Sequence, residues 1–178
     1  MSLVGSDRRY GLIAQGLHWL TAILVLWAWL IAGTWRHAGS DGAAIQMLHE
    51  TLGLTVFVLV LVRLVWRLFD RRPPEPPMPG MMALAAKASH WLLYGLLVAI
   101  PLTAITGSWL EGHAVTVYGV GAIGPWLTVS RSLGRQILEV HQLLGTTLIW
   151  VAGLHAAAAI FHHVFLRDRV LRQMLPIG

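Results

Sequence analysis

Four long apolar stretches alternate with short polar segments along the chain. At about 1.5 Å of rise per residue, each stretch is long enough to cross roughly 30 Å of hydrocarbon as an α-helix. The first is too long for a signal peptide and "AGTWRHAG" is a poor cleavage site, so we expect it to be retained. The pattern predicts an all-α integral membrane four-helix bundle, one domain over residues 1–178, with helices at about 12–34, 48–69, 82–110 and 140–166.

The polar segments between the stretches differ in character. "RRPPEPPMPG" is rich in proline, so it predicts an extended link that keeps the second and third helices adjacent. The Gly-rich segment 111–136 is the largest connection, and "SRSLGRQILEV" is expected to lead as a helix into the fourth span. Pro101 is expected to kink the third helix near mid-membrane.

Composition and charge support this topology. The chain is 56% hydrophobic and 12% charged, far from the mix of a soluble domain. With four spans, both termini share a side with the Pro-rich link, and most of the basic residues lie on that side. We therefore expect both termini to be cytoplasmic, and we take the high pI as a sign of topology and not of nucleic-acid binding. The basic residues of that side are Arg8, Arg9, Arg63, Arg67, Arg71, Arg72, Lys87, Arg167, Arg169 and Arg172, against Arg36, Arg131 and Arg135 on the other.

Histidines occur at two depths of the predicted bundle. "HETLG" and "HQLLG" open with His49 and His141, which lie at the outer ends of the second and fourth helices. His155 follows His141 by nearly four helical turns, about 21 Å, so both side chains leave that helix on similar faces. At the inner level His155 can pair with either His18 or His90. An ionisable residue inside a membrane is a functional candidate by default.

Paired histidines of this kind favour haem. Two facing imidazoles without a thiolate or carboxylate suit the iron of a haem better than zinc, which prefers four protein ligands in structural sites. Gly53 and Gly145 lie one turn beyond His49 and His141, where a missing Cβ lets a porphyrin plane approach. Because the chain has no Cys for thioether attachment, we expect two haem b groups per chain. The alternative is that such histidines only hydrogen-bond neighbouring helices.

Two arginines lie near the inner level of the second helix. Arg63 and Arg67 are spaced i,i+4, so they share a helix face near the level of His18 and His155. A guanidinium binds a carboxylate in bidentate fashion, which makes the deeper Arg63 a candidate partner for a haem propionate. The alternative is that both arginines only extend their charged heads towards the membrane surface.

Taken together, these motifs resemble the bacterial cytochrome b561 family of small di-haem membrane proteins, including its superoxide oxidase branch. The resemblance implies that His18 and His155 bind the cytoplasmic-side haem and that His49 and His141 bind the periplasmic-side haem. It thereby decides the inner-level alternative against His90. It covers nearly the whole chain and rests on "GLHWL", "LHETLG", "VRLVWRL", "ASHWLLYGLLVAIPLTAITG", "EVHQLLG" and "GLHAAAAIFHHVFLRD".

The resemblance also implies a reaction in the bacterial inner membrane. Superoxide would give one electron to the outer haem, the electron would move to the inner haem, and two turnovers would reduce ubiquinone to ubiquinol. The Pro-rich link lacks the lysines that close relatives offer near the quinone and has only Arg71, Arg72 and Glu75. His162, two turns beyond His155, is a candidate donor to a quinone carbonyl.

Two other functions are compatible with the pattern. One is a haem anchor subunit that links quinone to a partner dehydrogenase or a periplasmic cytochrome, and the other is a transporter with a histidine relay. A free-standing oxidase needs an outer surface that attracts a small anion, so we expect Arg36, Arg131, Arg135 and His113 around a path to the outer haem. The expected partners are membrane lipid, superoxide and quinone, with no nucleic acid.

Overall fold

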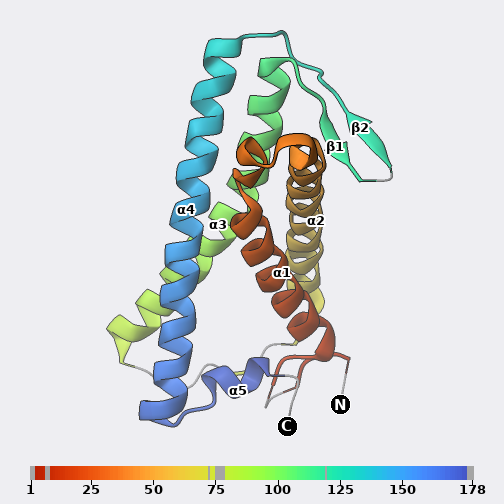
Figure 1. The fold of residues 1–178 in the computed structure, drawn as a ribbon. Helices are drawn as coiled ribbons and strands as arrows, with labels where there is room; N and C mark the ends of the chain where they lie inside the picture. The colour runs from red at the N-terminus through yellow and green to blue at the C-terminus, as the bar shows by residue number, and fades with distance from the viewer. Residues whose placement is uncertain (1–2, 7–8, 72, 75–78, 119, 176–178) are drawn as a thin grey trace.

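The computed structural model describes residues 3–6, 9–71, 73–74, 79–118 and 120–175. Arg8, Arg72 and Glu75, named above, lie outside these residues. Four long helices form one bundle (Figure 1). All four are long and apolar enough to cross a membrane, which confirms the predicted fold class. They are α1 (Leu12–Ile31), α2 (Gly42–Phe69), α3 (Gly80–Glu111) and α4 (Arg131–Phe161).

The helices extend beyond the apolar stretches at one end of the bundle. Helix α2 begins at Gly42, earlier than predicted. The segment before His49 is helical, although Gln46 interrupts its apolar pattern. Helix α4 begins at Arg131, which confirms that "SRSLGRQILEV" leads into the fourth span. Helix α3 continues through Pro101, and its ribbon bends along its length (Figure 1).

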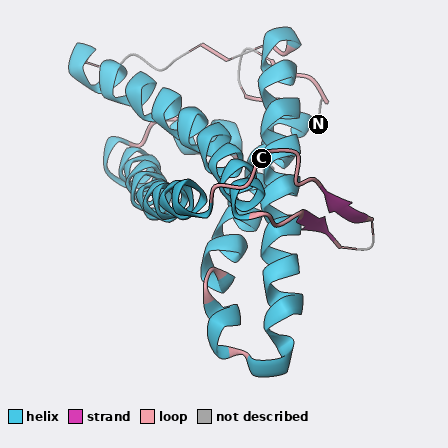
Figure 2. Cartoon of the chain, turned by 90° about the horizontal axis from the view of Figure 1, so that it is seen from above, coloured by secondary structure: helices cyan, strands magenta, loops and turns pink. Residues whose placement is uncertain are grey.

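Short elements cover the end of the bundle that we call the hairpin end. Strands β1 (Val115–Val117) and β2 (Gly121–Ile123) pair antiparallel and project beside the helices (Figure 2). The turns η1 (Thr34–His37) and η2 (Gly39–Asp41) join α1 to α2 at the same end. The sequence did not predict this hairpin, because three-residue strands are too short to leave an alternating pattern.

Both ends of the chain lie at the opposite end of the bundle, which we call the termini end (Figure 1). Helix α4 continues there into the wider turn η3 (His162–Leu166), followed by the short helix α5 (Val170–Met174). The backbone carbonyl of Gln173 accepts a hydrogen bond from Gln15 Nε2 at 3.2 Å, and that of Met174 accepts one from Trp19 Nε1 at 2.8 Å. The C-terminal segment is therefore fixed against α1.

The helices pack mainly as two pairs, α1 with α2 and α3 with α4. Near the hairpin end α3 and α4 approach through two glycines. A Cβ added to Gly134 would lie 2.9 Å from the carbonyl oxygen of Gly107, so a side chain there would force the helices apart. This close contact fixes the position of α4, which carries two of the histidines singled out in the sequence.

Candidate functional site

The hairpin end holds the first histidine pair. His49 on α2 and His141 on α4 face each other with ring centroids 6.3 Å apart and ring planes at 84°. His49 Nδ1 lies 2.9 Å from the backbone carbonyl of Ala28 on α1, and His141 Nδ1 lies 2.9 Å from that of Ile100 on α3. A carbonyl only accepts, so each Nδ1 carries the hydrogen and each Nε2 keeps a lone pair. This is the usual arrangement of a histidine that binds a metal.

The spacing of these rings suits a shared iron. Metals of this size bind an imidazole nitrogen at about 2.0 Å, and the ring centroid lies roughly 1.1 Å further on, which places the centroids of two trans ligands about 6 Å apart. The measured 6.3 Å agrees with that value. The same two helices also provide room, because a Cβ added to Gly53 or Gly145 would have no neighbour within 4 Å. The residues present therefore fit a haem.

The second cluster lies towards the termini end. His18 on α1 and His155 on α4 have ring centroids 6.4 Å apart, nearly the spacing of the first pair. His90 on α3 lies closer to His155, at 5.3 Å. All three lie at one level, as the sequence predicted. His18 and His155 are half-buried, like the first pair, whereas His90 is exposed on the bundle surface.

Arg63 accompanies the second cluster. Arg63 follows His49 on α2 by 14 residues, as His155 follows His141 on α4, so Arg63 lies at the level of the second cluster. Within the described parts of the chain, no acidic side chain forms an ion pair with Arg63. Its Cζ lies 5.5 Å from the ring centroid of Tyr94, a cation–π contact. A half-buried guanidinium with only an aromatic partner is suited to an anionic group such as a propionate.

His162 has a partner that the sequence analysis missed. Its Nδ1 lies 2.5 Å from Oδ2 of Asp168, and the other carboxylate oxygen accepts the backbone N–H of Val170 at 3.0 Å. The His162 side chain is only 12% exposed. No periodic pattern of residues predicts this pair, because the contact depends on the wider turn η3 that follows α4.

The residues beside His49 hold the β-hairpin in place. The Glu50 carboxylate accepts the backbone N–H of Thr116 at 2.7 Å and also the hydroxyl of that residue. The backbone N–H of Tyr118 donates to the Thr51 hydroxyl at 2.8 Å. The hairpin is therefore attached directly next to the first histidine pair.

The basic residues expected near the outer haem all lie at the hairpin end. Arg131 and Arg135 are exposed on the first turns of α4, and Arg36 is exposed on η1. The side chain of His113 is 74% exposed and lies 3.9 Å from the Glu111 carboxylate. This end of the bundle thus presents cationic side chains to solvent.

Four spanning helices with histidine pairs inside the bundle define a multi-pass helical membrane protein of the cytochrome b type. The chain belongs to the prokaryotic cytochrome b561 family, which it matches over residues 9–176. It is 31% identical to "Probable superoxide oxidase CybB" of Yersinia pestis over 172 residues, 95% of this chain and 97% of that protein. It is 28% identical to "Cytochrome b561 homolog 2" of Escherichia coli K12, over 98% of this chain and 95% of that protein. "Cytochrome b562" of Cereibacter sphaeroides is 30% identical, over 89% and 90% respectively.

Family membership confirms part of what the sequence predicted. The chain is a multi-pass bacterial membrane protein and an oxidoreductase that transfers electrons with haem b. The haem ligands, the electron donor and the electron acceptor are argued below as proposals.

Proposed function

We propose that this chain carries electrons from superoxide at the hairpin end to ubiquinone at the termini end, through two haem b groups. The observation that carries the proposal is the repeated spacing of two histidine pairs on different levels of one bundle, 6.3 Å for His49 and His141 and 6.4 Å for His18 and His155. A packing role alone gives no reason for two pairs to share a spacing that fits two histidines bound to one iron.

The proposed orientation places the hairpin end in the periplasm and both termini in the cytoplasm. Ten of the thirteen basic residues lie on the side of the termini or snorkel towards it, which supports this orientation. Superoxide would then be oxidised outside the inner membrane, and quinone would be reduced near its cytoplasmic surface.

The histidines of each pair would hold the iron of one haem. At the hairpin end the carbonyls of Ala28 and Ile100 fix both rings in the tautomer that leaves Nε2 available. Haem b held in this way supplies one-electron oxidation and reduction. At the termini end Arg63 is proposed to pair with a propionate, so that its positive charge would offset the carboxylate beside this haem.

Two exposed arginines support superoxide as the donor. Arg131 and Arg135 begin the helix that carries His141, and a cationic surface raises the local concentration of a small anion. Arg36 and His113 are proposed to add to this surface from neighbouring segments. The similarity to a protein named as a probable superoxide oxidase points to the same donor.

His162 is the sequence-based candidate for a contact with the quinone. With Nδ1 held by the Asp168 carboxylate, its Nε2 is the ring atom left to meet a quinone or quinol oxygen. The quinone would reach this end of the bundle through the surrounding lipid.

A direct test adds an enzymatic source of superoxide to the purified protein and follows the absorption bands of reduced haem. The proposal predicts that these bands appear, that superoxide dismutase prevents them, and that added ubiquinone reoxidises the protein and yields ubiquinol. If only a quinol reduces the haem and superoxide does not, the superoxide proposal is wrong, and a haem anchor subunit becomes the better description.

A further inference from the structure

The two histidines at the hairpin end come from different helix pairs. His49 lies on α2, which packs mainly with α1, and His141 lies on α4, which packs mainly with α3. The His49 ring contacts the Ala28 carbonyl on α1. The His141 ring contacts the Ile100 carbonyl on α3, so each of these hydrogen bonds stays within one pair of helices. They orient each ring, but neither of them fixes the distance between the two rings.

The β-hairpin joins the two helix pairs at this end. The Glu50 carboxylate on α2 accepts the backbone N–H of Thr116 at 2.7 Å and also accepts its hydroxyl. The Thr51 hydroxyl accepts the backbone N–H of Tyr118 at 2.8 Å. Both acceptors directly follow His49 in the chain. We call these three hydrogen bonds the hairpin clamp.

The hairpin is also fixed to α3 and, through α3, to α4. Trp109 on α3 donates from Nε1 to the backbone carbonyl of Ile123 on β2 at 3.0 Å. The chain after β2 lies against the same indole, since a Cβ added to Gly124 would clash with that ring. Helix α3 in turn lies in close contact with α4 through their two facing glycines. The hairpin clamp therefore connects the helical turn that carries His49 to the pair of helices that carries His141.

The contacts of Glu50 suit it to hold a fixed distance. Its Oε1 accepts a hydrogen bond from Gln46 Nε2 at 3.0 Å, one turn earlier on the same helix, while Oε2 accepts both donors of Thr116. Hydrogen bonds to an ionised acceptor are roughly twice as strong as those between neutral groups. Both carboxylate oxygens are therefore restrained, so the distance between α2 and β1 is fixed.

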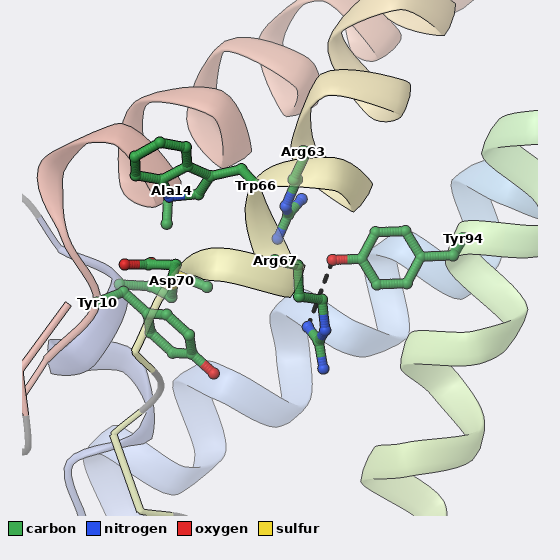
Figure 3. Close-up of a pocket in the computed structure, with 8 residues that line it drawn as sticks. Tyr10, Ala14, Arg63, Trp66, Arg67, Asp70 and Tyr94 are labelled. Atoms are coloured by element: carbon green, nitrogen blue, oxygen red, sulfur yellow. Dashed lines mark hydrogen bonds between the residues drawn. The ribbon is translucent and has the colours of Figure 1, made fainter. Parts of the chain in front are cut away.

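The termini end connects the two helix pairs in a different way. There Arg67 on α2 donates from Nη1 to the Tyr94 hydroxyl on α3 at 3.5 Å, so two side chains join the helices directly (Figure 3). The Tyr94 ring also lies 5.5 Å from Arg63 Cζ. Each end thus has its own connection. A change in the hairpin clamp should act on the hairpin-end histidine pair and leave the other pair in place.

We infer that Glu50 is a positioning residue for the hairpin-end haem site. Its hydrogen bonds to Thr116 hold His49 at the distance from His141 that one iron requires, with the ring centroids 6.3 Å apart. A site whose ligands are already in place loses less conformational entropy on binding, so the clamp should slow the release of this haem. The inference deepens the proposed function and rests on it, since it assumes that these two histidines bind one haem.

Haem transfer from the purified holoprotein to excess apomyoglobin tests the inference without turnover. Glu50→Ala removes the carboxylate, so the hairpin-end haem should leave roughly tenfold faster, while the termini-end haem should leave at its wild-type rate. Glu50→Gln keeps a carbonyl oxygen for Thr116 and should restore most of the wild-type rate. Glu139→Ala is the matched control and should change neither rate, because it removes an exposed acid on α4 two residues before His141.

Low-temperature electron paramagnetic resonance of the oxidised protein gives a second readout. The low-spin signal that His141→Ala removes marks the hairpin-end haem. Glu50→Ala should shift or broaden that signal, because the two ring planes are no longer held at one angle, and should leave the other signal at its position. Thr51→Val removes the acceptor for the Tyr118 N–H and should have the same effect in smaller measure, which provides a milder variant if Glu50→Ala does not fold.

Hydrogen exchange over the hairpin separates the outcomes. If Glu50→Ala speeds amide exchange at Thr116 and Tyr118 but leaves haem release and both signals unchanged, the clamp serves only the hairpin and the inference is overturned. Equal acceleration of release from both haem sites also overturns it, since that result indicates a general loss of stability. If His141→Ala removes neither signal, the proposed ligands are wrong and the inference fails with them. If His141→Ala removes one signal and Glu50→Ala changes nothing, only the inference fails.

Discussion

At the hairpin end, backbone carbonyls of neighbouring helices hold His49 and His141, whereas at the termini end the charged Arg63 lies at the level of the pair of His18 and His155. The two pairs share a ring spacing and differ in electrostatic surroundings. A nearby positive charge favours the reduced state of a redox centre. The comparison therefore suggests a direction, with the termini-end centre at the higher potential and electrons moving away from the hairpin end.

Removing a ligand from one pair should have the largest effect and should not affect the other pair. His49→Ala or His141→Ala should remove the hairpin-end haem and leave the termini-end haem, so that haem per chain falls by half. The measurement is a pyridine haemochrome assay against protein concentration. His37→Ala, an exposed histidine at the same end, is the matched control and should keep the full haem content. Equal loss of both haems would instead indicate misfolding.

At the termini end the test decides between two possible partners of His155, because three histidines lie at one level there. We expect His18→Ala to abolish binding of the termini-end haem and His90→Ala to retain it, since the ring spacing of His18 matches that of the other pair. Low-temperature electron paramagnetic resonance of the oxidised protein distinguishes the two outcomes through loss of one low-spin signal. Loss of that signal in His90→Ala, with retention in His18→Ala, would reverse the assignment.

The suggested direction depends on Arg63. Arg63→Gln should lower the midpoint potential of the termini-end haem by roughly 60 mV, a tenfold change in a one-electron equilibrium. A spectroelectrochemical titration measures this shift, and the hairpin-end potential serves as the internal reference. Equal shifts of both potentials would remove the electrostatic difference between the two ends.

The smallest effect is expected at the surface of the hairpin end. Charge reversal at Arg131 and Arg135 should slow haem reduction by superoxide several-fold and should leave reduction by quinol largely unchanged. For the wild type, the superoxide rate should also fall as salt rises, because the encounter joins an anion to a cationic surface. Stopped-flow absorbance measures both rates. If the rate of haem reduction by superoxide changed neither with salt nor with charge reversal, electrostatic steering would be contradicted.

The sequence predicted the four spans and the levels of the histidines, because both depend on position along a helix. The spacing of the residues left His18 and His90 as alternatives, since depth alone does not give the rotation of one helix against another, and only the family resemblance favoured His18. The contacts of the Ala28 and Ile100 carbonyls with the histidines could not be predicted, because every residue has a backbone carbonyl and its identity does not show which one faces a histidine on another helix. The hairpin clamp was missed for a similar reason, since it joins side chains of α2 to a hairpin that leaves no alternating pattern.

The most direct test of the account is the number of haems in the wild-type chain, measured by pyridine haemochrome together with quantitative amino-acid analysis. Two independent histidine pairs predict two haem b groups per chain and two components in a redox titration, the higher one assigned to the termini end by its loss in His18→Ala. A ratio of one haem per chain, with a single redox component, would contradict the account.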